Sequence, residues 1–203
     1  MPCKFEKDVH DDSAVSFILN KNVRGRFIRL DESLNSILSQ HKYPDSVCNL
    51  ICEAVLLTVM IGQALKLRWK LSIQIRGSGP VKLIAVDYFS PKDVDSFANV
   101  RAYSKFDPNE IDTRSKTNFH LLGKGIFAVL IDQGSGTEPY QGITPLIGDS
   151  LSDCAETYFD QSEQLPTSFK IMVAQKDTVD RVKNWRSGGI MLQQLPKATA
   201  FSQ

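Results

Sequence analysis

The stretch from Asp45 to Lys66, DSVCNLICEAVLLTVMIGQALK, decides the fold of this chain. On a helical wheel it is apolar on nearly every side and is interrupted only by Asn49, Glu53, Thr58 and Gln63. A helix without a polar face has to be buried on all sides, either in protein or in lipid. The choice between these two environments is the first functional question that the sequence raises.

The content of this helix favours a protein core. Val47 to Leu65 is long enough to cross a bilayer, but Glu53 near its middle would cost about 2.5 kcal/mol or more on insertion. The chain has no second candidate span, and its mean hydropathy is slightly negative. The N-terminal segment MPCKFEKDVHDD lacks the apolar stretch of a signal peptide. We therefore predict a cytoplasmic protein with no membrane partner.

Composition excludes several functional classes. With 203 residues the chain can bury one sizeable core, and its 24 basic and 23 acidic residues give a net charge of +1. Such a balance does not indicate a nucleic-acid partner. The cysteines, Cys3, Cys48, Cys52 and Cys154, do not have the spacing of a disulfide-stapled secreted module, which indicates a reducing compartment.

The segments on both sides of the helix alternate between strand and turn signals. Apolar residues recur at period two in strands and at helical spacing in helices, and Gly- or Pro-rich pieces separate them. The expected strands are 23–30, 69–76, 81–89, 97–104, 126–131, 138–145, 169–173 and 188–196. The expected shorter helices are 32–41 and a segment from Ser150 to the residues before Pro166, and the expected loops are 105–118 and 175–187, the latter as a loop or short helix.

Six or more strands thus arrive mostly as hairpins, and one helix needs cover on every side. Two layers of sheet with the helix between them satisfy both requirements. The predicted fold class is α+β, a three-layer β/α/β arrangement with a buried central helix between two mainly antiparallel sheets.

The most enzyme-like string is GDSLSD, from Gly148 to Asp153, which resembles the nucleophile block of GDSL esterases. Those enzymes need a histidine base to activate the serine, normally in a D-x-x-H near the C-terminus, and none occurs here. The histidines, His10, His41 and His120, all precede Ser150. The structural alternative for Ser150 is an N-cap, with Asp153 three residues on completing a capping box. An esterase remains the alternative function.

No other cofactor or metal signature is complete. The pieces GSGP, GKG and GSGT do not form a G-x-x-x-x-G-K-[ST] phosphate loop. Cys48 and Cys52 are one helical turn apart and offer at most two of the four ligands of a tetrahedral metal site, so we expect them to be packing residues. We predict no catalytic, cofactor-binding or metal-binding residue, which favours a binding protein over an enzyme.

The run YQGITPLIGDSLSDCAETYFDQSEQLPT, from Tyr140 to Thr167, resembles the signature of the 33 kDa chaperonin family, the redox-regulated heat-shock protein 33. Further pieces match in order from Val23 to Pro196: VRGRFIRLD, LSIQIRGSGPVKLIAV and GGIMLQQLP. The resemblance implies an ATP-independent holdase that binds unfolded polypeptides under oxidative or heat stress and pairs as a homodimer. It also implies a C-terminal domain that holds zinc through C-x-C and C-x-x-C, and whose oxidation releases the metal and uncovers a client-binding surface.

This sequence departs from that family pattern at its end. It stops at Gln203 and contains neither cysteine motif, so none of its own cysteines inherits the switch role. The resemblance then implies a tail at 1–22, a chaperone core domain at 23–196 and the start of a linker at 197–203, with zinc expected only in the missing domain of a longer parent. A natural short form, and a dimerisation scaffold that binds no client, are the alternatives. The residues of the client surface are not predicted.

Overall fold

The computed structural model describes residues 12–20, 22–93, 96–111, 117–177 and 183–195. They form nine strands, three α-helices and two short helical turns. In chain order these are β1 (Ser13–Leu19), β2 (Val23–Leu30), α1 (Glu32–Leu38), α2 (Asp45–Ala64), β3 (Lys70–Gly77), β4 (Val81–Phe89), β5 (Asn99–Phe106), η1 (Phe119–Leu122), β6 (Gly125–Asp132), β7 (Tyr140–Pro145), α3 (Leu151–Tyr158), η2 (Phe159–Glu163), β8 (Thr167–Asp177) and β9 (Lys183–Gln194).

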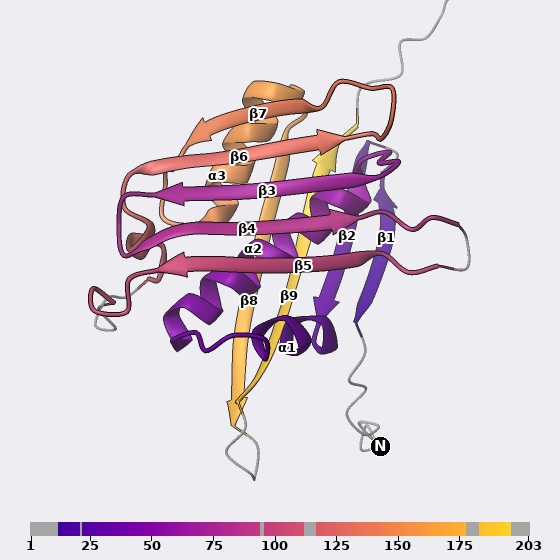
Figure 1. Cartoon of the computed structure of the whole chain (residues 1–203). Helices are drawn as coiled ribbons and strands as arrows, with labels where there is room; N and C mark the ends of the chain where they lie inside the picture. Colours follow the sequence, from indigo (N-terminus) through magenta and orange to yellow (C-terminus); the bar gives the residue numbers. More distant parts are fainter. Residues whose placement is uncertain (1–11, 21, 94–95, 112–116, 178–182, 196–203) are drawn as a thin grey trace, which may run out of the picture.

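The strands form two antiparallel sheets. The four-stranded sheet has the order β1-β2-β9-β8, and the five-stranded sheet has the order β5-β4-β3-β6-β7. Most neighbours are hairpins, as the turn signals predict, but β2 pairs with β9 across nearly the whole chain. Figure 1 shows the five-stranded sheet in front, with its strands running across those of the four-stranded sheet behind it.

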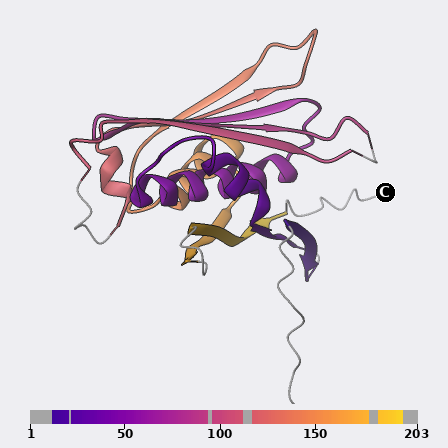
Figure 2. The ribbon, with the colours of Figure 1, turned by 60° about the horizontal axis from the view of Figure 1, so that its bottom comes forward.

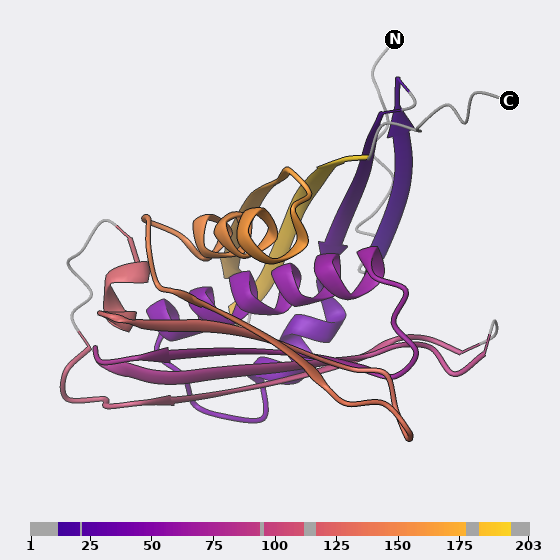
Figure 3. The ribbon, with the colours of Figure 1, turned by 90° about the horizontal axis from the view of Figure 1, so that it is seen from above.

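Helix α2 lies between the two sheets. Fifteen of its 20 residues are buried, because it packs on the inner faces of both sheets and beside α3. Figures 2 and 3 show this layer of helix between the sheets. By length and composition α2 could also span a membrane, but 83% of its apolar window is buried inside the protein. The predicted β/α/β core with a buried central helix is confirmed.

Glycines bring the layers close to α2. A Cβ atom on Gly62 of the helix would lie 2.4 Å from the ring of Tyr88 in β4. On the other side, a Cβ on Gly189 of β9 would lie 2.7 Å from the carbonyl oxygen of Lys170 and 3.2 Å from a methyl group of Leu56. A Cβ on Gly62 would clash with β4, and a Cβ on Gly189 would clash with β8 and press on the helix, so each sheet packs on α2 at a position occupied by glycine.

The structure corrects several expected boundaries. Part of the tail assigned to 1–22 is strand β1, which is paired with β2 over seven residues. The loop or helix expected at 175–187 is largely strand, because β8 runs to Asp177 and β9 starts at Lys183. Long-range pairing between β8 and β9 overrides the polar local sequence there. Residues 1–11 and 197–203, which include the ends of the expected tail and linker, lie outside the described part of the chain.

Candidate functional site

The outer face of the four-stranded sheet carries the apolar side chains that the core does not use. In β2, Ile28 and Leu30 point inward and are 1% and 5% exposed, whereas Phe27 is 47% exposed. Alternation along an antiparallel strand places Phe27 on the face turned away from α2. A core-forming strand would normally carry a polar residue at such a position.

Strand register gathers further apolar residues on the same face. Val15 of β1 pairs with Phe27, and Phe27 pairs with Ile190 of β9, so three strands contribute to one row. The rows beside it add residues from β8 and from the hairpin of β1 and β2. The apolar face consists of Val15, Phe17, Leu19, Val23, Phe27, Met172, Ile190 and Leu192.

A glycine shapes the middle of the apolar face. Gly25 pairs with Phe17, and a Cβ atom on Gly25 would lie 2.2 Å from the Phe17 ring. The ring therefore lies flat over the backbone of β2 instead of standing away from the sheet. This arrangement extends the apolar face across the gap that Gly25 leaves in its own row.

Charged groups border the apolar face and also lie on it, because Lys170 of β8 pairs with Ile190 and Arg29 follows Phe27 on the same side of β2. At one end Arg186 donates from Nε to Asp31 Oδ2 at 2.7 Å, and the Asp31 side chain is only 3% exposed. At the other end is a hollow of about 570 Å³ whose lining includes Val23, Leu192 and the carboxylates of Glu156 and Asp160. An apolar centre with a polar rim is the usual composition of a protein interaction surface.

The apolar face is open in the described structure. Figure 3 shows α2 and α3 on the side of the four-stranded sheet that faces the other sheet, and no described element on its outer side. Val15 is 57%, Leu19 48% and Met172 79% exposed. Burying such a surface against another apolar surface removes both from water and lowers the free energy. This does not require a particular sequence in the partner.

Ser150, the serine of the GDSLSD string, has the structural role predicted for it. Its hydroxyl caps α3 by accepting the N–H of Asp153 at 3.2 Å, and Asp153 Oδ2 accepts the N–H of Asp149 at 2.8 Å. The described histidines interact elsewhere: His41 packs near the rings of Tyr43 and Tyr103, and the His120 ring bonds to a backbone carbonyl. Neither ring has Ser150 among its described contacts. His10 lies outside the described residues.

The described cysteines are buried thiols. Cys48 is 7% exposed and Cys52 and Cys154 are fully buried, and all three are free. Burial raises the pKa of the Cys48 and Cys154 thiols to about 11 and raises that of Cys52 as well. Among the described residues no group of three or more His, Cys, Asp or Glu side chains could hold a metal ion. The zinc implied by the family resemblance therefore does not fit these residues, and Cys3 lies outside the described part.

The apolar face was missed by sequence reasoning, although a signal for it exists. Val15, Phe17 and Leu19 recur at period two directly before the polar triplet 20–22 and the strand VRGRFIRL. Two such runs around a short turn are a hairpin signal. Assigning 1–22 to a tail removed the edge strand, and with it the outer row of the face.

The fold and this face define an α+β domain in which two antiparallel sheets enclose a helix and one sheet keeps an open apolar surface. A family model described as Hsp33 protein matches residues 12–203. The chain is 41% identical to the 33 kDa chaperonin of Caulobacter vibrioides over 191 residues, which is 91% of this chain and 61% of that protein. It is 31% identical to the 33 kDa chaperonin of Salmonella typhi, covering 96% of this chain and 62% of that one.

A solved structure shows the same fold. The crystal structure of the 33 kDa chaperonin from Thermotoga maritima matches with a TM-score of 0.74 at 22% identity, over 91% of this chain and 61% of that one. The chain belongs to the Hsp33 family. It spans about three fifths of the length of the curated relatives that it matches.

Proposed function

We propose that this chain is the core of a chaperone that holds non-native polypeptides on the apolar face of its four-stranded sheet. The observation that carries the proposal is the open row that joins Val15, Phe27 and Ile190 across three strands. Unfolding proteins expose apolar side chains without a fixed arrangement. A flat apolar surface with a charged rim suits such partners better than an enclosed pocket does.

The proposed mechanism uses neither nucleotide nor covalent chemistry. Affinity comes from burying apolar area, and release follows when the client buries the same side chains in its own core. The relatives' name, chaperonin, supports this mechanism. The alternative, an esterase, has no support from Ser150, whose hydroxyl caps α3. We also propose a cytoplasmic location. We further propose that two copies of the chain pair, and sedimentation over a concentration range would test this pairing.

The redox response and zinc expected from the family resemblance are proposed for the parent protein and not for these residues. A reactive thiol needs a lowered pKa and access to solvent. Cys48, Cys52 and Cys154 have raised pKa values and are buried, so oxidants should act elsewhere in the full-length protein.

Aggregation of a thermally unfolded model enzyme, luciferase, tests the proposed function. The chain should lower light scattering, and Phe27→Ser and Met172→Ser should each weaken this effect about twofold or more, because each removes exposed apolar area from the face. Ile143→Ser is the matched control, since Ile143 is 52% exposed but lies on β7 of the other sheet.

Two results would contradict the proposed function. Equal holding by all three variants would mean that the apolar face is not the client surface. Scattering that the unmodified chain leaves unchanged, under reducing and oxidising conditions alike, would refute holding by this chain.

A further inference from the structure

Strand β1 lies at the edge of the four-stranded sheet, and its outer row of backbone groups has no partner among the described residues. The N–H of Leu195 donates to the carbonyl of Asn22 at 2.7 Å, so even-numbered residues of β2 direct their backbone groups toward β9 and odd-numbered ones toward β1. The register pairs odd-numbered residues of β2 with odd-numbered residues of β1. Odd-numbered residues of β1 therefore bond to β2. Even-numbered residues direct their N–H and C=O groups away from the sheet: Ala14, Ser16 and Ile18.

Each of the other three sheet edges has one outward backbone position that is obstructed. On β5 the N–H of Ser104 donates to the hydroxyl of Tyr43 at 3.1 Å. On β8 the N–H of Phe169 donates to Glu156 Oε1 at 2.8 Å. On β7 the outward row includes Pro145, which has no N–H. Side chains and proline are the usual means by which proteins prevent strand addition at an edge.

Strand β1 has none of these protections. Its sequence, SAVSFIL, contains neither charge nor proline, and six of its seven residues are exposed. Figure 3 shows the hairpin of β1 and β2 projecting beyond the helices. Among the described residues no group bonds to the outward backbone row of β1. An uncharged and unpaired edge of this length is a template for another extended segment.

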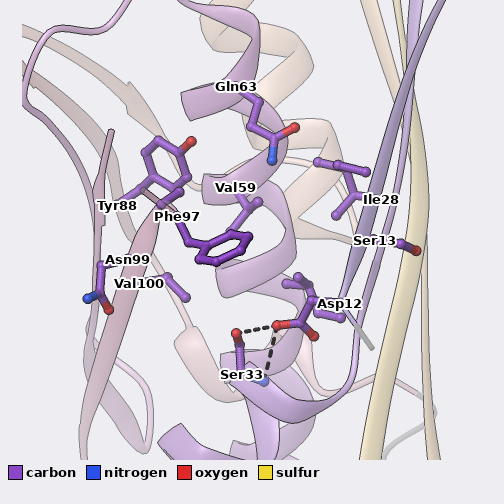
Figure 4. A pocket seen from close by; sticks show the side chains of 13 residues that line it. Asp12, Ser13, Ile28, Ser33, Val59, Gln63, Tyr88, Phe97, Asn99 and Val100 are labelled. Atoms are coloured by element: carbon purple, nitrogen blue, oxygen red, sulfur yellow. Dashed lines mark hydrogen bonds between the residues drawn. The ribbon is translucent and has the colours of Figure 1, made fainter. Parts of the chain in front are cut away.

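An apolar cleft lies beside this edge. It has a volume of about 350 Å³, and its lining includes Ala14 of β1, Val100 of β5 and Val59 of α2. Figure 4 shows the ring of Phe97 lying across the cleft in front of Val59. Side chains of β1 that point inward, such as Ala14, face this space.

We propose that the free edge of β1 binds an extended segment of the client as an added antiparallel strand. This inference rests on the proposed function and names the form in which a client is held. Backbone hydrogen bonds from Ala14, Ser16 and Ile18 would fix the segment. Its side chains would then alternate between the apolar face on the outside and the Phe97 cleft on the inside.

The chemistry of the edge defines the preferred partner. Backbone pairing is independent of sequence, so the selection comes from the two rows of side chains. The outer row meets the apolar face, and the inner row meets the cleft beside Ala14 and then the Arg26 guanidinium that is bonded to Ser16. The edge therefore favours segments of about five to seven residues whose outward side chains are β-branched or aromatic. Proline or charge within the segment should oppose binding. Such segments are buried in folded proteins and appear when those proteins unfold.

Direct binding of a peptide tests the proposal without a chaperone assay. The probe is a fluorescent ten-residue peptide of alternating valine and threonine with a lysine at each end, and its matched control carries N-methyl groups on alternate amides. Amide hydrogen exchange of the whole chain should slow at Ala14, Ser16 and Ile18 on adding the probe. Exchange at Val15 should change little, since that amide already bonds to β2.

Two pairs of variants locate the contact. Ser16→Pro removes the central outward N–H, whereas Ser16→Ala keeps it while losing the bond from Arg26 to the Ser16 hydroxyl. The proline variant should bind the probe about tenfold more weakly than the alanine variant, because a donor is lost and the ring blocks the edge. Ile18→Pro against Ile18→Thr repeats the comparison near the hairpin tip, where a proline disturbs folding least.

The results decide between the two proposals. Equal binding by the proline variants and their controls, or no binding of the probe by the unmodified chain, overturns strand addition. Probe binding at β1 by a chain that does not suppress aggregation overturns the proposed function and leaves strand addition standing. Loss of holding in Phe27→Ser alone, with both proline variants unaffected in every assay, supports the apolar face and refutes the edge.

Discussion

At the scale of single residues, the half-buried Glu53 is the most unusual group of helix α2. It lies on α2 between the fully buried residues Cys52 and Ala54, and no described hydrogen bond or ion pair involves its carboxylate. Burial raises the pKa of the Glu53 carboxyl from 4.5 to about 7. The same residue that argues against a transmembrane helix thus titrates near neutral pH inside the protein.

This pKa links stability to pH. Between about pH 4.5 and 7 the folded chain keeps a proton on Glu53 that the unfolded chain has released, so folding takes up protons. Stability attributable to Glu53 is therefore greatest at the acid end and falls as the pH rises through 7. Glu53→Gln, which stays neutral, should be more stable than the unmodified chain by about 2 kcal/mol at pH 8 and nearly equal to it at pH 5.

Urea unfolding at pH 5, 7 and 8 measures this difference. Glu138→Gln is the matched control, because Glu138 is exposed in the turn between β6 and β7 and should show no such trend. A constant difference between the Glu53→Gln variant and the unmodified chain across this range would show that Glu53 stays ionised in the folded protein.

At the scale of elements, two adjacent glycines in β9 allow the effect of close packing on stability to be measured apart from the effect of strand propensity. A Cβ on Gly189 would lie 2.7 Å from a backbone oxygen and would press on Leu56 and Met60, whereas a Cβ on Gly188 has its nearest neighbour at 3.8 Å. Gly189→Ala should therefore destabilise the chain by about 1–3 kcal/mol, because β9 or α2 must move. Gly188→Ala should be neutral or slightly stabilising.

Thermal or urea unfolding of the two variants checks this prediction. Both carry the same chemical change in the same strand, so the difference between them isolates the crowding at Gly189 by the Lys170 carbonyl of β8 and by Leu56 and Met60 of α2. Equal stabilities would mean that the helix layer can shift at no cost, contrary to the tight sandwich described above.

The same scale shows which elements the sequence predicts. Strand β3 follows from alternation, β6 from a run that is apolar on both faces, and β4 and β7 from the Gly-rich turns that precede them, because hairpins are local structures. The N-cap of α3 at Ser150 is likewise a local effect and is predicted. Strand β1 has a local alternation signal but was assigned to a tail, whereas the ends of β8 and β9 were not predicted because their polar stretches become strand only through partners elsewhere in the sheet.

At the scale of the whole molecule, the candidate site depends on a pairing that local patterns do not encode. The apolar face exists because β2 lies beside β9, more than 150 residues away in the chain. Composition predicts that α2 is enclosed, and therefore that two sheets exist. Which side of each sheet remains open follows from the order β1-β2-β9-β8, and single-sequence periodicity carries no information on that order.

Because both sheets pack on α2, they should unfold as one unit. The chain has two tryptophans, one for each sheet: Trp69 directly precedes β3, and Trp185 lies in β9 and is 6% exposed. Trp69→Phe and Trp185→Phe each leave one fluorescent tryptophan. Circular dichroism measures how far each substitution shifts the stability of its own variant. After correction for that shift, the two fluorescence midpoints in urea should be equal.

Removing core volume from α2 extends this test to the shared core. Leu56→Ala, at a fully buried position next to Gly189 of β9, should cost about 2–5 kcal/mol and should lower the midpoints of both reporters equally. If the midpoint of the Trp185 reporter fell while that of Trp69 remained, the sheets would be separate folding units. In that case the four-stranded sheet could open while the five-stranded sheet stays folded, and its apolar face would not be a fixed surface.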